Sequence, residues 1–234
     1  MSNIKVLYED NHIIAVVKPA GVLTQGDSSG EKCLMDMVKD YLKERYKKPG
    51  NVFLGLVHRL DKPVSGIVLF GKTSKGASRL SEQFRNHTIQ KTYYAIVVGK
   101  PKESRGVITE KINKISFFAE GFTNKSDEEL LQEIKKATKT RTAELSYEIV
   151  KSNDKYSLLK ILPKTGRFHQ IRVQMAEMGC PVLGDAKYGK QKMPEWKDDK
   201  SIALCATGIL FKSATVEKDI KLEIPLPEMW QELI

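Results

Sequence analysis

The chain has 234 residues, 41% of them hydrophobic, and a formal net charge of +10. This length suits one large domain or two small ones, and the apolar content excludes a mainly disordered chain. The positive field attracts polyanions, above all nucleic acid, although on charge alone a lysine-rich surface that only aids solubility is an equal alternative.

Cysteine and histidine usage predicts neither a disulfide framework nor a metal site. Cys33, Cys180 and Cys205 are odd in number and widely spaced, which favours a reducing compartment. No CxxC pair occurs, and no histidine stands at ligand spacing from a cysteine. The N-terminus lacks a signal-like apolar run, and no stretch approaches the ~20 apolar residues of a membrane span. We therefore expect a cytoplasmic protein that contacts no membrane.

The first half of the chain predicts a hairpin, two helices and a buried strand. Residues 4–8 and 12–17 are apolar and β-branched and flank a polar turn, as in a β-hairpin. Apolar positions recur at helical spacing in residues 31–46, and Ser74 can cap a second helix. Between these helices, residues 66–71 contain the strand-like run Ile-Val-Leu-Phe.

The second half alternates strands with two further helices. A capping box between Ser126 and Glu129 predicts a helix to about residue 137, within a lysine-rich insertion. Another helix is predicted from about residue 167 to 178, closed by Gly179. Strands are expected at residues 91–98, 142–150, 156–162, 203–211 and 220–224. We therefore predict one α+β domain, residues 1–234, on a mixed, mainly antiparallel sheet flanked by helices and loops.

A phosphate-loop pattern is present but is rejected on physical grounds. Residues 66–73 read GIVLFGKT and match GxxxxGK[ST]. A phosphate loop must curl so that its amides face the phosphate, whereas Ile-Val-Leu-Phe prefers an extended, buried conformation. A nucleotidase is therefore a distant alternative. The Gly-x-Ser-x-Gly, HExxH and GxGxxG signatures do not occur.

Asp61 stands in a polar segment, His58-Arg59-Leu60-Asp61-Lys62-Pro63, just before the buried strand. Because proline restricts the residue before it and breaks a helix, we expect a loop beside the sheet, where functional sites often form. On spacing alone, an Asx-type turn explains Asp61 better than catalysis does.

A second polar segment gathers Arg167, His169, Gln170 and Arg172 within six residues. These side chains make a dense donor set for phosphates or a carboxylate. His169 and Arg172 are three apart and are expected to share a helical face. A solvated basic face is the alternative.

A third segment, Lys91-Thr92-Tyr93-Tyr94-Ala95, is predicted to be a strand. On a strand, Tyr93 and Tyr94 point to opposite faces. One ring is expected in the core, and the other can stack on a base, as aromatic side chains of RNA-binding proteins commonly do.

Together and in this order, these segments resemble the RluA-type pseudouridine synthases. HRLDKPVSGIVLFGKT resembles the catalytic motif of that family, and residues 10–21 resemble its opening hairpin and turn. KTYYAIVVG, TGRFHQIRVQMAEMGCPVLGDAKYG and ALCATGILF resemble its later motifs. The resemblance covers nearly the whole chain and implies a pseudouridine synthase fold and an isomerase acting on RNA.

The resemblance also implies roles for single residues. Asp61 corresponds to the catalytic aspartate, Tyr93 to the tyrosine that stacks on the target uracil, and Arg172 to the arginine that pairs with the aspartate. Arg59 matches a position that some members insert into the RNA helix. Contacts to RNA are expected from the basic and polar side chains of these motifs: His58, Arg59, Lys62, Lys91, Arg167, His169 and Gln170.

The chain departs from the family pattern in three respects. Cys205 stands where the family often has histidine, and Ser213-Ala214 stands where it often has His-Pro. The chain begins at the hairpin, so we expect a short form without the N-terminal S4-like RNA-binding domain of many members. These differences bear on RNA contacts and packing more than on the chemistry.

Isomerisation of uridine breaks a C–N bond, turns the uracil and joins its C5 to C1′, without net redox change. The resemblance therefore implies no cofactor and no metal. It leaves open whether the aspartate attacks the base, attacks C1′ or abstracts a sugar proton. The expected partner is RNA, which is ribosomal RNA, transfer RNA or both, with the protein as a monomer. A non-catalytic RNA-binding protein that retained the fold is the alternative function.

Overall fold

A ten-stranded mixed sheet organises the computed structural model, which describes residues 4–112, 141–189, 196 and 200–234. Its strand order is β1-β2-β4-β9-β5-β8-β7-β6, with β10 paired to β9 and β3 paired to β4. In the described part of the chain β4 and β9 pair in parallel, and the other strand pairs are antiparallel. The strands are β1 (Lys5–Glu9), β2 (Ile13–Lys18), β3 (Gly55–Leu56), β4 (Ser65–Gly71), β5 (Gln90–Val98), β6 (Arg105–Ile112), β7 (Arg141–Ser152), β8 (Tyr156–Pro163), β9 (Leu204–Lys212) and β10 (Asp219–Glu223).

The predicted N-terminal hairpin is present as β1 and β2. Its turn is stabilised by Asp10, whose carboxylate accepts hydrogen bonds from the amides of His12 and Ile13, both at 2.7 Å. Four successive residues of β2, Ile13 to Val16, are fully buried, because each face of the sheet carries its own apolar cluster. This explains why β2 is a continuous apolar run rather than an alternating one.

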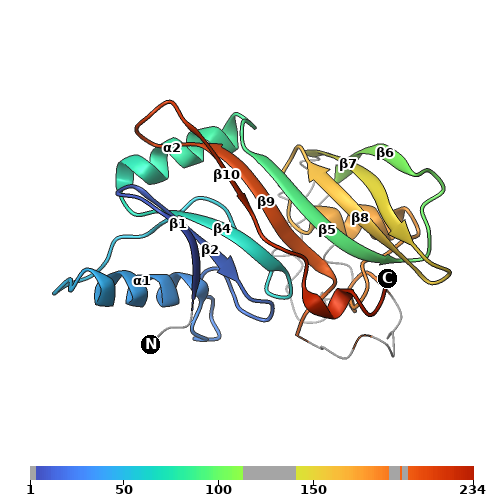
Figure 1. Ribbon diagram of the computed structural model, residues 1–234, viewed down its shortest axis with the longest axis horizontal. Helices are drawn as coiled ribbons and strands as arrows, with labels where there is room; N and C mark the ends of the chain where they lie inside the picture. Colours follow the sequence, from blue (N-terminus) through green and yellow to red (C-terminus); the bar gives the residue numbers. More distant parts are fainter. Residues whose placement is uncertain (1–3, 113–140, 190–195, 197–199) are drawn as a thin grey trace, which may run out of the picture.

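Helices cover both faces of this end of the sheet. Helix α1 (Leu34–Arg45) buries Leu34, Val38 and Leu42 in one cluster, and helix α2 (Ser74–Arg85) buries Leu80 in the other. Figure 1 shows both helices beside β1, β2 and β4, and β6, β7 and β8 at the opposite end. The prediction that Ser74 caps α2 is wrong by one residue, because the Thr73 side chain accepts the hydrogen bond from the Gly76 amide.

The phosphate-loop pattern falls on β4, as the rejection of that motif predicted. Residues 66–71 are an extended strand between β2 and β9. Gly66 has φ +129°, and a Cβ there would overlap the backbone of Ala206. Glycine is therefore required where β9 approaches β4, and this approach brings the loop before β4 against the later strands.

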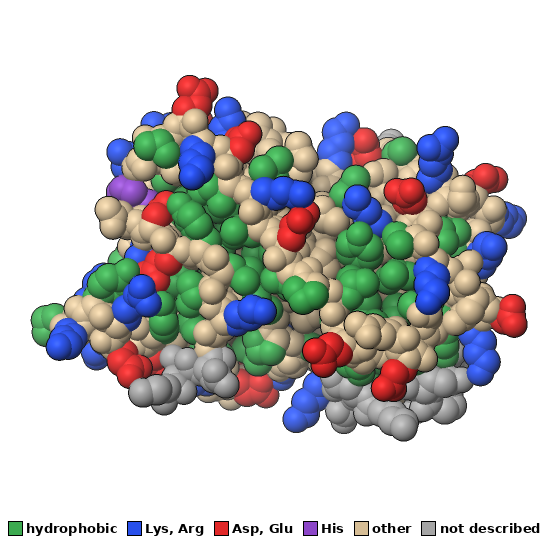
Figure 2. Space-filling view, in the orientation of Figure 1, with side chains coloured by type: hydrophobic (Ala, Val, Ile, Leu, Met, Phe, Trp, Pro, Cys, Tyr) green, Lys and Arg blue, Asp and Glu red, His purple; other side chains and the backbone are tan. Residues whose placement is uncertain are grey.

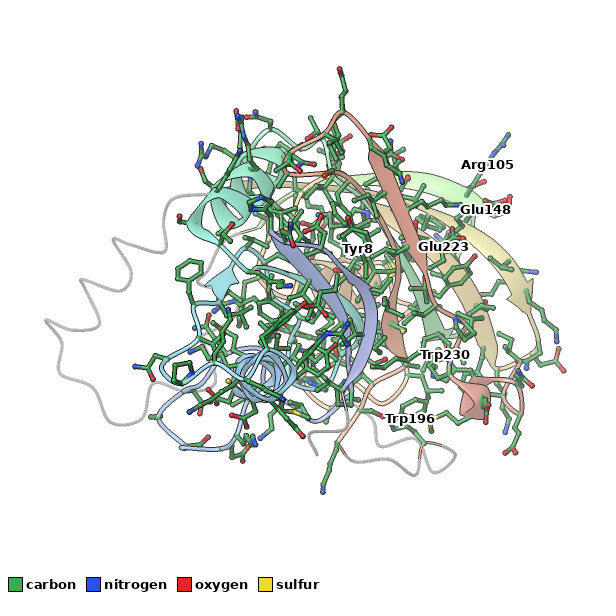
Figure 3. All side chains as sticks on the ribbon, turned by 60° about the vertical axis from the view of Figure 1, so that its left-hand side comes forward. Tyr8, Arg105, Glu148, Trp196, Glu223 and Trp230 are labelled. Carbon is green, nitrogen blue, oxygen red and sulfur yellow. The ribbon has the colours of Figure 1, made fainter. Side chains whose placement is uncertain are left out.

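The other end of the sheet is the antiparallel run β5-β8-β7-β6. Its two outer strands pair Arg105 of β6 with Glu148 of β7, and Figure 3 shows the two side chains near each other. The face drawn in Figure 2 intersperses Lys and Arg with Asp and Glu. Strand β6 was not predicted from the sequence. The helix predicted at residues 126–137 lies outside the described residues.

Helix α4 (Gln170–Glu177) begins later than the predicted residue 167. His169 is its N-cap residue and adopts a left-handed backbone, φ 51°. The predicted end is confirmed: Gly179 has φ +81°, and its amide donates to the carbonyl of Ala176. Within the described residues no helix is long and apolar enough to cross a membrane. The predicted α+β class is confirmed.

Candidate active site

The loop that carries Asp61 lies between β3 and β4 and is fastened on both sides. The Thr24 hydroxyl donates to the carbonyl of Leu60 at 2.7 Å and accepts from its amide at 3.1 Å. On the other side, the Lys62 carbonyl accepts from the Gly21 amide at 2.8 Å. The Asp61 carbonyl accepts from the Val64 amide at 3.1 Å and closes the turn that the proline predicted. The Asp61 backbone is thereby held in place.

Lys18 is buried beneath this loop and was not predicted to belong to the site. Its side chain is fully buried, and its Nζ donates to the carbonyls of Pro19, Val22 and Lys62 at 2.6–3.0 Å. Burial lowers the pKa of Lys18 to about 7, against the opposing effect of the Asp61 charge. A lysine at the end of an otherwise apolar strand was the available signal.

Arg172 lies between two carboxylates. Its Nη1 donates to Asp61 Oδ2 at 3.2 Å, and its Nε and Nη2 donate to the two oxygens of Asp185 at 2.6 and 2.9 Å. Burial disfavours the charge, but Asp185 and then Asp61 raise the pKa of Arg172 above its ordinary value. The predicted proximity of Arg172 to Asp61 is therefore present. Asp185 was missed, because a lone acid after Gly184 carries no pattern of its own.

Asp185 holds the guanidinium by a bidentate contact that fixes its orientation. Its side chain is 2% exposed, and its Oδ1 also accepts from the amides of Lys187 and Tyr188 at 3.1 and 3.3 Å. The Tyr188 ring lies under the guanidinium, 5.0 Å from Arg172 Cζ to the ring centroid. Arg172 is thus held by Asp185 and Tyr188, and Nη1 remains for Asp61.

His169 also reaches Asp61, although it does not share a helical turn with Arg172. Its Nε2 lies 3.5 Å from Asp61 Oδ2, and its Nδ1 lies 2.8 Å from the Tyr188 hydroxyl. The shared-face prediction was wrong because α4 starts one residue after His169. The left-handed backbone of His169 turns its ring toward the loop instead.

A pocket of about 110 Å³ opens over Asp61. Tyr93 lines it from β5, and Lys91 lies two residues earlier on the same strand face. Burial raises the pKa of Tyr93, with a further contribution from the Asp61 charge, so the hydroxyl stays protonated. Burial lowers the pKa of Lys91 to about 8. The polar side chains that line this pocket are Arg59, Asp61, Lys91, Tyr93, Thr165, Arg167, His169, Gln170 and Arg172.

Two residues expected to contact RNA do not line the pocket. His58 Nε2 accepts from the Leu69 amide at 2.9 Å, and its ring stacks on Phe84 with centroids 4.6 Å apart. Burial lowers the pKa of His58 to about 3, so the ring is neutral. Lys62 points elsewhere and pairs with Glu31 at 2.7 Å. The structure therefore gives His58 a packing role and places Lys62 at the surface.

The structure also places Gln170 and Cys205, which the sequence analysis singled out. Gln170 accepts hydrogen bonds from the Thr165 hydroxyl and the Arg167 amide, so it shapes the turn into α4. Cys205, one of the departures from the family pattern, is buried in β9 opposite Ser65 of β4. Within the described residues there is no group of three or more His, Cys, Asp or Glu side chains that could hold a metal ion.

Comparisons with known proteins agree with this geometry. Residues 12–177 match the family model described as RNA pseudouridylate synthase. The ribosomal large subunit pseudouridine synthase C of Rickettsia typhi is 33% identical over 223 residues, covering 95% of this chain and 68% of that protein. The tRNA pseudouridine synthase C of Vibrio cholerae is 30% identical over 242 residues, covering 99% and 94%.

A solved structure has the same fold. Human RNA pseudouridylate synthase domain containing 4 superposes with a TM-score of 0.76 at 24% identity and covers 98% of this chain and 92% of its own. The fold likeness, the family match and the two bacterial relatives point the same way as the sequence motifs. The chain belongs to the RNA pseudouridylate synthase family and is an isomerase that acts on RNA.

Proposed function

We propose that Asp61 is the catalytic carboxylate of this pseudouridine synthase, with Tyr93 and Arg172 as its partners in the site. The observation that carries the proposal is the contact between Asp61 and Arg172 at the floor of a pocket lined by an aromatic ring. Asp61 is 22% exposed and Arg172 is 7% exposed, so the carboxylate reaches the pocket while its counter-charge is withdrawn from it.

The target uridine enters this pocket after it leaves the RNA stack, because a side chain cannot reach its sugar or ring inside a duplex. The Tyr93 ring then packs against the uracil, and Arg172 holds the Asp61 carboxylate through Oδ2. Arg59 is exposed at the pocket rim, where it can occupy the space that the base vacates. Lys91 and Arg167 supply positive charge for the flanking phosphates.

Each of the three possible routes requires an ionised aspartate. Attack on C1′ displaces the uracil and forms an ester, and this ester bond breaks as C5 bonds to C1′. Abstraction of a sugar proton expels the uracil, and the protonated carboxyl returns that proton to the sugar as C5 bonds to C1′. Attack on the base forms an adduct, whose bond to Asp61 breaks after C5 has replaced N1 at C1′. In all three routes the C5 proton leaves and N1 gains one. The pocket need supply only binding, orientation and proton transfer.

The substrate is a uridine in ribosomal or transfer RNA. Relatives that carry each of these names match nearly the whole chain, which supports either class. We further propose that residues 1–234 act as one catalytic domain, as a cytoplasmic monomer, and that the protein needs no protein partner. Mapping of pseudouridines by carbodiimide in total RNA, with and without the gene, will identify the position.

Replacement of Asp61 tests the catalytic assignment. Asp61→Asn keeps the size of the side chain and removes its charge, so we expect unchanged folding and RNA affinity and no detectable tritium release from C5-labelled uridine RNA. Asp154→Asn makes the same change in an exposed turn and serves as the matched control. An Asp61→Asn protein that still formed pseudouridine would overturn the assignment.

A further inference from the structure

The contacts of Asp61 are unequal between its two carboxylate oxygens. Arg172 Nη1 and His169 Nε2 both approach Oδ2, at 3.2 and 3.5 Å. Among the described residues no contact to Oδ1 is formed within hydrogen-bonding or ion-pair distance. A carboxylate held through one oxygen presents the other to whatever occupies the pocket.

His169 has a strained, left-handed backbone at the start of a helix, where such a conformation is unusual. The described non-glycine residues with positive φ are Lys47, His87 and His169. Lys47 and His87 directly follow the C-caps of α1 and α2, where left-handed residues commonly end a helix. His169 instead begins a helix, where the cap residue is normally extended. Such strain persists when the surroundings demand it, and it clusters at functional sites.

The surroundings also select the tautomer of His169. The Tyr188 hydroxyl lies 2.8 Å from His169 Nδ1 and can either donate to it or accept from it. The Asp61 carboxylate, 3.5 Å from Nε2, can only accept, so this contact favours the tautomer with the proton on Nε2. When Nδ1 accepts a hydrogen bond, the ring proton of a neutral histidine resides on Nε2. Burial lowers the pKa of His169 to about 4, against the opposing charge of Asp61. A neutral ring with Nε2–H toward Asp61 follows.

We propose that His169 and Tyr188 form a positioning pair: the Tyr188 hydroxyl donates to His169 Nδ1, and the His169 Nε2–H holds Asp61 Oδ2, leaving Oδ1 as the oxygen that meets the substrate. This inference rests on the proposed catalytic role of Asp61. It gives His169 a different task from the RNA contact predicted from the sequence. An RNA contact acts on substrate binding, whereas a positioning residue acts on the chemical step.

Two substitutions of His169 separate its contact with Tyr188 from its contact with Asp61. An asparagine amide reaches the Nδ1 position near Tyr188 and tolerates a left-handed backbone, but it cannot reach Asp61. A glutamine amide reaches the Nε2 position and can donate to Asp61. We expect His169→Asn to lower the single-turnover rate about 100-fold, because a catalytic group misplaced by about 1 Å costs that much. The single-turnover rate of His169→Gln is expected to be about tenfold higher than that of His169→Asn, because the glutamine amide can donate to Asp61.

The dissociation constant for the RNA should stay within about threefold in both variants, because phosphate contacts are untouched. His87→Asn is the matched control: His87 also has positive φ, 55°, and is exposed at the end of α2. Weaker binding with an unchanged single-turnover rate in His169→Asn would return His169 to the role of RNA contact and overturn the proposal.

Tyr188→Phe tests the second half of the pair and keeps the ring that packs on Arg172. We expect the rate to fall about tenfold, which corresponds to one lost hydrogen bond. In the His169→Asn background the same change should cost less than about twofold, because partners in one network are not additive. Equal losses in both backgrounds would show that Tyr188 acts independently of His169.

Proton-detected ¹⁵N spectra of histidine-labelled protein provide a readout of the tautomer itself. The resonance of His169, identified by its loss in His169→Asn, should report Nε2–H from pH 8 down to about pH 5, because its pKa is lowered to about 4. Tyr188→Phe should abolish that preference without unfolding the protein. An Nδ1–H tautomer in the parent protein would overturn the proposal. Activity in Asp61→Asn would instead overturn the catalytic assignment, so the two failures are distinguishable.

Discussion

Two buried acid–base clusters lie in different parts of this molecule, and they satisfy their carboxylates differently. In the cluster of β1 and α1, Glu9 accepts from Lys72 at 2.6 Å, from Tyr46 at 2.7 Å and from Tyr41 at 3.1 Å. Its two oxygens are therefore both used. In the pocket, the contacts of Asp61 with the described residues converge on Oδ2 alone.

The difference separates a carboxylate that holds structure from one that can react. Glu9 is 9% exposed, and its partners close it off. Asp61 is 22% exposed and receives a single contact from Arg172. The bidentate contact of Arg172 is made with Asp185. Burial and ion pairing occur in both clusters, so neither property alone identifies a site. We expect the distinguishing property to be a pocket-lining carboxylate with one oxygen that has no partner among the described residues.

The largest expected effect is on the single-turnover rate, through the contact between Asp61 and Arg172 in the pocket. Arg172→Ala removes the cation that contacts Asp61 Oδ2, so the single-turnover rate should fall about 1,000-fold, as for loss of a preorganised electrostatic group. RNA affinity measured by filter binding should change far less. Equal losses of binding and rate would contradict the Asp61–Arg172 pairing and place Arg172 among the RNA contacts.

The next effect is on stability, in the other cluster. Lys72→Met leaves Glu9 buried without its nearest cation, and breaking a buried ion pair typically costs about 3 kcal/mol. Urea unfolding should show this loss, while the single-turnover rate of the folded protein should stay unchanged. Lys62→Met removes an exposed pair with Glu31 and should cost less than about 1 kcal/mol, which makes it the control.

The same cluster predicts how stability depends on pH. Burial raises the pKa of Glu9, but hydrogen bonds from Lys72 and Tyr46 outweigh it, so the pKa lies below 4.5. The whole contribution of Glu9 to stability is therefore present when the pH is above its pKa in the unfolded state. This contribution is lost as the pH falls through its lower pKa in the folded state. Urea unfolding of Glu9→Gln should vary less between about pH 5 and pH 3 than that of the parent protein. An unchanged slope would contradict the lowered pKa.

The smallest effect concerns RNA affinity. Affinity should fall steeply with salt, because contacts to phosphate release counterions. Arg167→Ala, in the pocket lining, should reduce the slope of log affinity against log salt by about 0.7, the value for one contact to a single strand. Lys72→Met should leave the slope unchanged, since Lys72 faces Glu9. A salt-independent affinity would exclude phosphate contacts as the source of binding.

Much of the fold follows from local patterns in the sequence. Runs of β-branched residues identified β2 and β4, and glycine at position 179 identified the end of α4. The start of α4 was placed too early because residues 167–169 have helix-compatible side chains. Their backbone is decided by long-range contacts, including the bond from Arg167 Nε to the Thr142 carbonyl at 3.1 Å. Strand β6 was missed because its partner β7 begins about thirty residues later along the chain.

For the site, the sequence by itself determined the chemical groups: an aspartate beside a proline turn, a tyrosine on a strand and an arginine in a donor-rich segment. Their motifs also indicated the family. Only the tertiary structure decided which groups meet. It places His58 against Phe84, outside the pocket lining, and it adds Lys18, Asp185 and Tyr188 to the surroundings of Asp61. The physical reason is that the charge and hydrogen bonds of a carboxylate depend on distances of a few ångströms, which strand pairing and helix packing set between residues far apart in the chain.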